Sequence, residues 1–295
     1  MGLVACTPSD APPAAVMPGL AEALPTLNEV RIEQGGETLN MERQGSHWMI
    51  PEAGWRVDRR WLQPLLLGLS EARCDEPKTA DPARYAQIGI DWPSSTPVVD
   101  AATGAFARPT GRVSVSLAAG EQAVIIGFPQ ARGGTYVRAE SSPQGCLSNA
   151  TLRLPAQVSE WMDPRLWAER PASPAWVQIE DANQTPLRLV AVDGRYRVAG
   201  QVLALTPLPD ALVAAVLDLR QQGLRAASDA DPERVIRFEA ADGLYAVALR
   251  READATWARV IEAPDTQGEG FAGREFRLPP DVADPLWASR ESLGA

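Results

Sequence analysis

Short alternating segments of apolar and polar residues occur in both halves of the chain, a pattern that predicts β-strands. Val30–Glu33 and Leu39–Glu42 flank a Gly35-Gly36 turn, so we expect a hairpin there. The other predicted strands of the first half are Trp48–Ile50, Val113–Leu117, Ala123–Gly127 and Thr135–Arg138. Those of the second half are Trp176–Ile179, Leu187–Val190, Gly194–Val198, Val235–Phe238, Tyr245–Leu249 and Trp257–Ile261.

One amphipathic helix is predicted in each half. The first follows Asp58, a favourable N-cap residue, and carries an apolar stripe at helical spacing. The stripe consists of Trp61, Leu62, Leu65, Leu66 and Leu69. Pro64 predicts that this helix either begins near Gln63 or bends. The second helix is expected over about residues 208–222, where Gly223 is a plausible stop.

A repeated motif indicates an internal duplication. Residues 154–167 and 278–287 both contain Leu-Pro-x-x-Val, followed by Asp-Pro and Leu-Trp. Each motif follows three predicted strands, a helix and three further strands, and the first half has an additional segment over residues 76–109. We therefore predict an α+β protein of two tandem similar units, residues 28–170 and 171–295. Each unit is expected to be a mostly antiparallel sheet with one main helix packed on a face.

The N-terminal residues contain a lipoprotein-like motif. Leu3-Val4-Ala5-Cys6 is similar to a bacterial lipobox, in which the cysteine becomes the lipidated first residue. Only two residues precede the motif, and the alternative is that Cys6 is an ordinary cysteine. Residues 7–19 contain four prolines and suit a semi-extended tether, so residues 1–27 are predicted to be anchor and tether. Thr7, which replaces the Asp of inner-membrane retention, favours the outer membrane.

Cys74 and Cys146 are the remaining cysteines. If Cys6 is lipidated, an oxidising periplasm permits a disulfide between the other two. The alternative, a pair of buried free thiols, is equally consistent with the sequence. No two cysteines have the Cys-x-x-Cys spacing of redox and metal sites, so neither is expected.

Four segments resemble a known bacterial family. They are Gly45-x-x-Trp48-x-Ile50 before Val57-Asp58, Ile88-Gly89-Ile90-Asp91-x-Pro93, Ile126-Gly127, and Thr135-Tyr136-Val137. Together they resemble the family described as domain of unknown function 4340, most clearly over residues 30–167. The resemblance implies an envelope protein, in some cases associated with ABC transporter components of the gliding-motility type. It implies no catalytic residue.

The composition excludes several functional classes. The chain has 295 residues, 45% of them hydrophobic and 22% charged, with a formal net charge of −10. Such an acidic chain is a poor match for nucleic acid, which requires a surplus of Lys and Arg. His47 and Lys78 are the only residues of their types, so a His-rich zinc site is excluded. We expect no cofactor and no metal.

Two tryptophans in loop-like stretches, Trp55 and Trp92, are candidate contacts for a sugar or a partner protein. The alternative is that they cover the core. The candidate catalytic carboxylates are Asp58, Asp91, Asp163 and Asp284. Each occupies a position that is typical of a helix cap or a turn.

Taken together, these features predict a non-catalytic, lipid-anchored protein on the periplasmic face of a bacterial membrane. It is expected to bind envelope or membrane proteins as a scaffold subunit, with an ABC-transporter assembly as one possibility. The first alternative is a periplasmic module that binds a glycan or small ligand through Trp55 and Trp92. The second is a carboxylate-based hydrolase.

Overall fold

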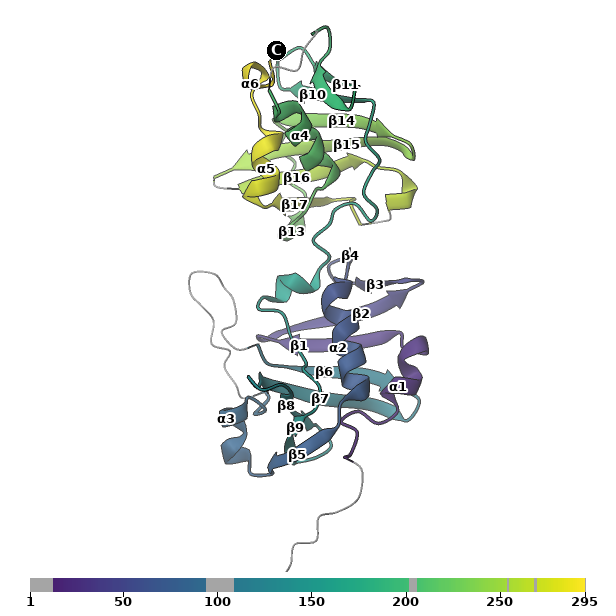
Figure 1. Cartoon of the computed structure of the whole chain (residues 1–295), viewed down its shortest axis with the longest axis vertical. Helices are drawn as coiled ribbons and strands as arrows, with labels where there is room; N and C mark the ends of the chain where they lie inside the picture. The colour runs from purple at the N-terminus through teal and green to yellow at the C-terminus, as the bar shows by residue number, and fades with distance from the viewer. Residues whose placement is uncertain (1–12, 94–108, 202–205, 254, 268–269, 295) are drawn as a thin grey trace, which may run out of the picture. The chain divides into compact units, whose positions relative to one another are not determined.

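The computed structural model describes residues 13–93, 109–201, 206–253, 255–267 and 270–294 (Figure 1). Its contacts divide the chain into two compact units, residues 1–163 and 164–295, whereas the expected boundary followed residue 170. Each unit contains an antiparallel sheet, with nine described strands in the first and eight in the second. The predicted mixed, mainly antiparallel class is thus confirmed. No helix in the described part of the chain has the length and hydropathy needed to span a membrane.

The first sheet has the strand order β4-β3-β2-β1-β6-β7-β8-β9-β5. Its strands are β1 (Glu29–Gln34), β2 (Glu37–Gln44), β3 (His47–Ile50), β4 (Trp55–Arg56), β5 (Cys74–Thr79), β6 (Gly111–Leu117), β7 (Gly120–Pro129), β8 (Thr135–Ala139) and β9 (Gly145–Ser148). The shorter elements are α1 (Leu20–Ala23), η1 (Leu24–Thr26), η2 (Pro82–Arg84), α3 (Tyr85–Ile88) and η3 (Val158–Trp161). Val30 lies opposite Met41, so the predicted hairpin is confirmed.

Helix α2 (Arg59–Glu71) lies across one face of this sheet (Figure 1). The Asp58 carboxylate caps it by accepting a hydrogen bond of 2.9 Å from the Arg60 backbone N–H. Because the helix begins at Arg59 and continues through Pro64, the predicted start near Gln63 is wrong. Its buried leucines form one hydrophobic core with alternate residues of the central strands. The main members are Leu62, Leu65, Leu66, Leu69, Val30, Ile32, Val113, Val124 and Ile126.

The described part of the predicted tether is packed rather than extended. The Val16 N–H donates to the Ala72 carbonyl oxygen at 3.0 Å, and the Cys74 N–H donates to Ala14 at 2.9 Å. Val16, Met17 and Leu20 are buried in the core of the first unit. These apolar residues lie between the prolines, which explains why composition alone predicted a tether up to residue 27.

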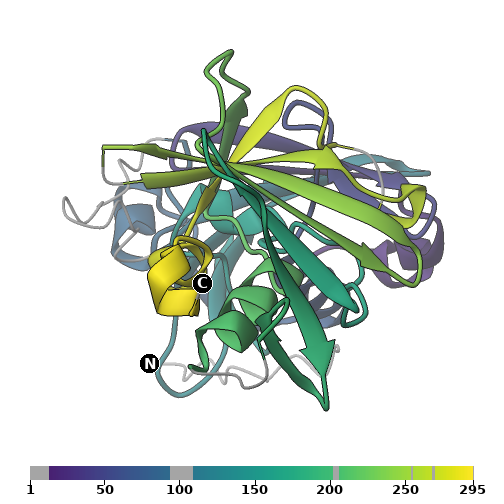
Figure 2. The ribbon, with the colours of Figure 1, turned by 90° about the horizontal axis from the view of Figure 1, so that it is seen from above.

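The second sheet has the strand order β12-β11-β10-β14-β15-β16-β17-β13. Its strands are β10 (Trp176–Asp181), β11 (Leu187–Val192), β12 (Arg195–Val198), β13 (Gly223–Ala226), β14 (Arg234–Ala240), β15 (Gly243–Glu252), β16 (Ala255–Glu262) and β17 (Arg274–Leu278). Its helices are α4 (Leu208–Leu217), η4 (Asp265–Gln267), α5 (Pro280–Leu286) and α6 (Arg290–Leu293). Figure 2 shows α4 and α5 on the same side of this sheet, where they contact each other.

Helix α4 is shorter than predicted. It ends at Leu217, and Gly223 is the first residue of β13 rather than the residue that stops the helix. The predicted stop is wrong because Asp218 already leaves the helical conformation, with φ −117° and ψ 41°.

The Leu-Trp end of the first repeated motif belongs to the core of the second unit. Trp167 packs edge-on against Tyr245, with ring centroids 5.1 Å apart, and Tyr245 stacks on Phe238 at 4.7 Å. The Trp167 indole N–H also donates to the Val216 carbonyl oxygen of α4 at 2.8 Å. This aromatic cluster joins the segment that begins the second unit to its helix and its sheet.

The two sheets have the same strand order. When β1, β2 and β3 are matched with β10, β11 and β12, β5 matches β13, and β6 to β9 match β14 to β17 in sequence. Helices α2 and α4 occur at the same point of the two series, before β5 and β13 respectively. Among the described strands, β4 is the one without a counterpart.

Candidate functional site

Trp55 is not available to a ligand. Its side chain is fully buried, and its indole N–H donates a hydrogen bond of 2.8 Å to the backbone carbonyl oxygen of Asp163. The preceding Gly54 suggested a loop, but Trp55 lies in β4, opposite Ile50 of β3. The prediction that Trp55 contacts a sugar or partner is therefore wrong, and its alternative, a core role, is correct.

Trp92 is half-buried at a second, smaller hydrophobic cluster. It packs against a group formed by Tyr85, Ile90 and Ile125. The Gly89 of the same segment has φ +74° and ends α3, a conformation that favours glycine. A Cβ atom at Gly89 would lie 2.8 Å from the Phe128 ring. This segment therefore has a clear packing role, and ligand contact by Trp92 stays a prediction.

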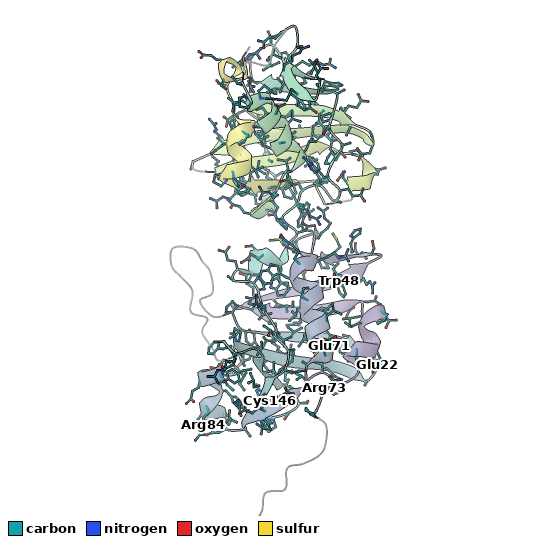
Figure 3. All side chains as sticks on the ribbon, in the orientation of Figure 1. Glu22, Trp48, Glu71, Arg73, Arg84 and Cys146 are labelled. Atoms are coloured by element: carbon teal, nitrogen blue, oxygen red, sulfur yellow. The ribbon has the colours of Figure 1, made fainter. Side chains whose placement is uncertain are left out.

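Cys6 and Thr7 lie outside the described residues. Cys74 and Cys146 are free thiols on two paired strands, the edge strand β5 and its neighbour β9. Burial raises the pKa of the Cys146 thiol well above its ordinary value. The side chain of Cys146 is labelled in Figure 3. The disulfide stays a prediction, and the structure places the two residues it requires on paired strands.

A buried ionic cluster fixes the end of the first unit. The Arg56 Nε atom lies 3.7 Å from Asp163 Oδ2, with side chains only 9% and 7% exposed. The Asp163 N–H donates to the Arg56 carbonyl oxygen at 2.8 Å, and the Asp58 N–H donates to Trp161 at 2.7 Å. Both aspartates were expected at caps or turns. Asp58 caps α2, whereas Asp163 pairs with Arg56 in the interior. Both carboxylates therefore have structural roles in the fold.

The face of the first sheet that carries Arg112 is polar and rich in glutamate. The Arg112 guanidinium contacts Glu140 at 2.7 Å, Glu33 at 2.8 Å and Glu121 at 3.5 Å. The hydrogen bond with Arg112 lowers the pKa of Glu140 from its ordinary value. Among the described residues, no three His, Cys, Asp or Glu side chains converge to hold a metal ion.

A groove of about 230 Å3 lies between α2, η1 and the β2–β3 hairpin, and we call it the α2 groove. Its apolar lining is Leu24, Trp48, Leu62, Leu66 and Leu67, and its polar lining is Arg43, Ser46, Arg59 and Gln63. Figure 3 labels Trp48 on β3, beside the first half of α2. Leu67 is 48% exposed, an unusual position for a large apolar side chain.

The charges around the α2 groove are positive. Arg60 is neutralised by Asp58, whose Oδ2 atom lies 2.6 Å from its guanidinium, and this hydrogen bond raises the pKa of Arg60. Arg43 donates to the Pro25 backbone carbonyl oxygen at 2.8 Å and has no carboxylate partner within the described chain. The guanidinium of Arg59 makes neither a hydrogen bond nor an ion pair with any described residue.

The α2 groove was not predicted from the sequence. Leu67 lies between two members of the predicted apolar stripe but is not part of it, and a large apolar residue outside the stripe of a helix signals an exposed contact. The arginines of the rim were visible only as isolated charges, since their pairing depends on the fold.

Comparisons with protein-family models, with curated proteins and with solved structures found no match.

Proposed function

We propose that this protein is a lipid-anchored, non-catalytic envelope protein that acts as a binding or scaffold subunit of a membrane-associated assembly. The observation that carries the proposal is the shared strand order of the two sheets. A scaffold that repeats one sheet and one helix offers several preformed surfaces for partners, as repeat proteins do. A bound ABC-transporter component is one partner that fits the resemblance described above.

We infer that the two units are copies of a single α+β unit with one main helix each, α2 in the first and α4 in the second. The matching series of strands and the repeated Leu-Pro-x-x-Val motif support this inference. Independent formation of the same order of eight strands is a poor explanation, because sheets of this size allow many orders.

The anchor is proposed at Cys6, on the periplasmic face of a bacterial membrane, with Thr7 favouring the outer membrane. Ala14 is hydrogen-bonded to the fold, so only the residues between Cys6 and Ala14 are available as a tether. At roughly 3.3–3.6 Å per residue, this segment reaches about 28 Å. An anchored chain would thus hold the β5 edge of the first unit close to the membrane.

Expression from the native chromosomal locus with a C-terminal tag tests the proposal. After solubilisation of membranes in mild detergent, we expect the protein in the membrane fraction, labelled by radioactive palmitate and accompanied by a membrane-protein partner. The Cys6→Ala variant should lose the label and move to the soluble fraction. A wild-type protein that is unlabelled, water-soluble and monomeric would contradict the proposal.

A further inference from the structure

We propose that the α2 groove is the docking site for an acidic segment of a partner protein, which inserts one or two large apolar side chains between α2 and the β2–β3 hairpin. This inference rests on the proposed function, because it assigns the binding role to a site. It also names the chemistry of the partner segment: carboxylates around an apolar anchor.

The apolar floor of the α2 groove is built into the core. Leu62 and Leu66 are buried members of the helix stripe, and their outer surfaces line the groove together with the half-buried Trp48. Leu67 extends this surface outward and is 48% exposed. A continuous apolar surface that reaches from a core to a solvent-exposed leucine is typical of the anchor pockets in protein interfaces.

The rim of the α2 groove selects for negative charge. Arg43 and Arg59 lie on it without carboxylate partners in the described part of the chain, and no described residue that lines the groove is acidic. Arg59 is also the first residue of α2, where the positive end of the helix dipole disfavours a cation. The first turn of α2 contains no acidic residue. The chain as a whole has a net charge of −10, but these two arginines make the rim of the groove locally positive. A locally positive rim is complementary to an acidic segment of a partner.

The size of the groove favours side-chain anchors. Pockets that enclose a small molecule typically have volumes of about 300–1,000 Å3. The α2 groove has about 230 Å3 and is partly open to solvent, which suits one or two large side chains of a peptide. A peptide also supplies carboxylates at several positions, and these can reach both arginines of the rim.

The groove begins at the N-terminal end of α2, whereas Ala14 and Val16 are bonded near its C-terminal end. The helical part of the lining runs from Arg59 to Leu67, whereas Val16 is bonded to Ala72, just beyond the last residue of the helix. A helix of 13 residues spans about 20 Å. A chain anchored through the residues before Ala14 would be attached near the C-terminal end of α2, which leaves the Arg59 end of the groove accessible to a protein.

A library of short random peptides displayed on phage tests the proposal. The library is selected on the wild-type protein after depletion on an Arg59→Glu, Leu67→Glu double variant. We expect the surviving peptides to be acidic and to carry at least one Leu, Ile, Phe or Trp. Synthetic copies should bind with dissociation constants in the micromolar range by fluorescence anisotropy. Each single variant should weaken binding about tenfold or more.

Matched control variants show whether a change in peptide binding comes from the α2 groove or from added negative charge in general. Ile261→Glu introduces the same charge at a leucine-sized side chain with the same 48% exposure, and Arg84→Glu reverses an exposed arginine elsewhere in the first unit. Both controls should leave peptide binding unchanged.

Surviving peptides that are basic or lack apolar residues, or equal weakening by the controls, would overturn the proposal. Displacement of the peptides by palmitate, with peptide affinities unaffected by Arg59→Glu, would assign the groove to a lipid instead. Failure here leaves palmitate labelling and partner copurification unchanged, so it is distinguishable from failure of the proposed function.

Discussion

The indole nitrogen of Trp55 donates a hydrogen bond of 2.8 Å to the backbone carbonyl oxygen of Asp163, the last residue of the first unit. Two residues 108 positions apart in sequence thereby join the edge strand β4 to the end of the unit. The neighbouring Arg56–Asp163 ion pair also connects β4 to the end of the first unit.

Replacement of Trp55 by Phe should therefore destabilise the protein. The variant keeps an aromatic ring but leaves the buried Asp163 carbonyl without its indole donor, a loss of about 1–3 kcal/mol in the free energy of unfolding. Urea unfolding followed by circular dichroism measures it. Trp48→Phe is the control, because Trp48 is only half-buried and lies on the α2 groove. Equal stability of the two variants would contradict this account of Trp55.

Gly89→Ala should be more destabilising than Gly45→Ala. Both glycines have positive φ values, +74° and +62°, so both variants carry a backbone cost of about 1 kcal/mol or more. Only at Gly89 would the new Cβ atom also collide with the Phe128 ring, at 2.8 Å. The difference in melting temperature between the two variants measures the destabilisation caused by this collision. If the Gly45 variant were the less stable, the packing role given to the Ile88-Gly89-Ile90 segment would be wrong.

Much of this fold was predictable from local pattern. The alternating segments gave most of the central strands, and the apolar stripe identified α2. Strands β4, β5, β9, β13 and β17 were not predicted, for particular reasons. Strand β5 contains Pro77 and has exposed residues at four successive positions, so it has no alternation. Strands β9 and β13 have only four residues each, too few to establish a period.

The candidate site was less predictable than the fold. Trp55 follows a glycine and was read as a loop residue, yet pairing with Ile50 buries it. The α2 groove depends on which arginines find carboxylates, and Asp58 neutralises Arg60 rather than Arg59. Which arginine pairs with which carboxylate depends on the three-dimensional fold, so the spacing of residues in the sequence does not predict it.

Oxidation should link Cys74 to Cys146 within one chain. In a Cys6→Ala background, oxidised glutathione would accept the electrons of both thiols, forming one protein disulfide and two reduced glutathione molecules. The protein should lose the mass of two hydrogen atoms and gain stability, about 4 kcal/mol in the chain-entropy estimate. Intact-mass spectrometry checks the product, with Cys74→Ser as the control. Stable glutathione adducts on the two cysteines would show that they cannot join.

The stabilising effect of Glu140 should disappear in acid. Its hydrogen bond with Arg112 lowers its pKa in the folded state, so its contribution is present above the ordinary pKa and is lost as pH falls through the lowered value. Because the side chain is 49% exposed, Glu140→Gln should cost no more than about 1 kcal/mol at pH 7. The difference from wild type should shrink below pH 4.5. Glu71→Gln, at an exposed residue of α2, serves as the control in the same pH series of urea unfolding. A difference that grows in acid would contradict the assignment.

Site-specific photo-crosslinking in the native host tests the central claim, that this protein holds a partner through the α2 groove. A photoreactive phenylalanine analogue at Leu67 should give one discrete crosslinked membrane protein with an acidic contact segment, and the same analogue at Ile261 should not. Crosslinks that are absent from Leu67, or equally abundant at both positions, would contradict the account.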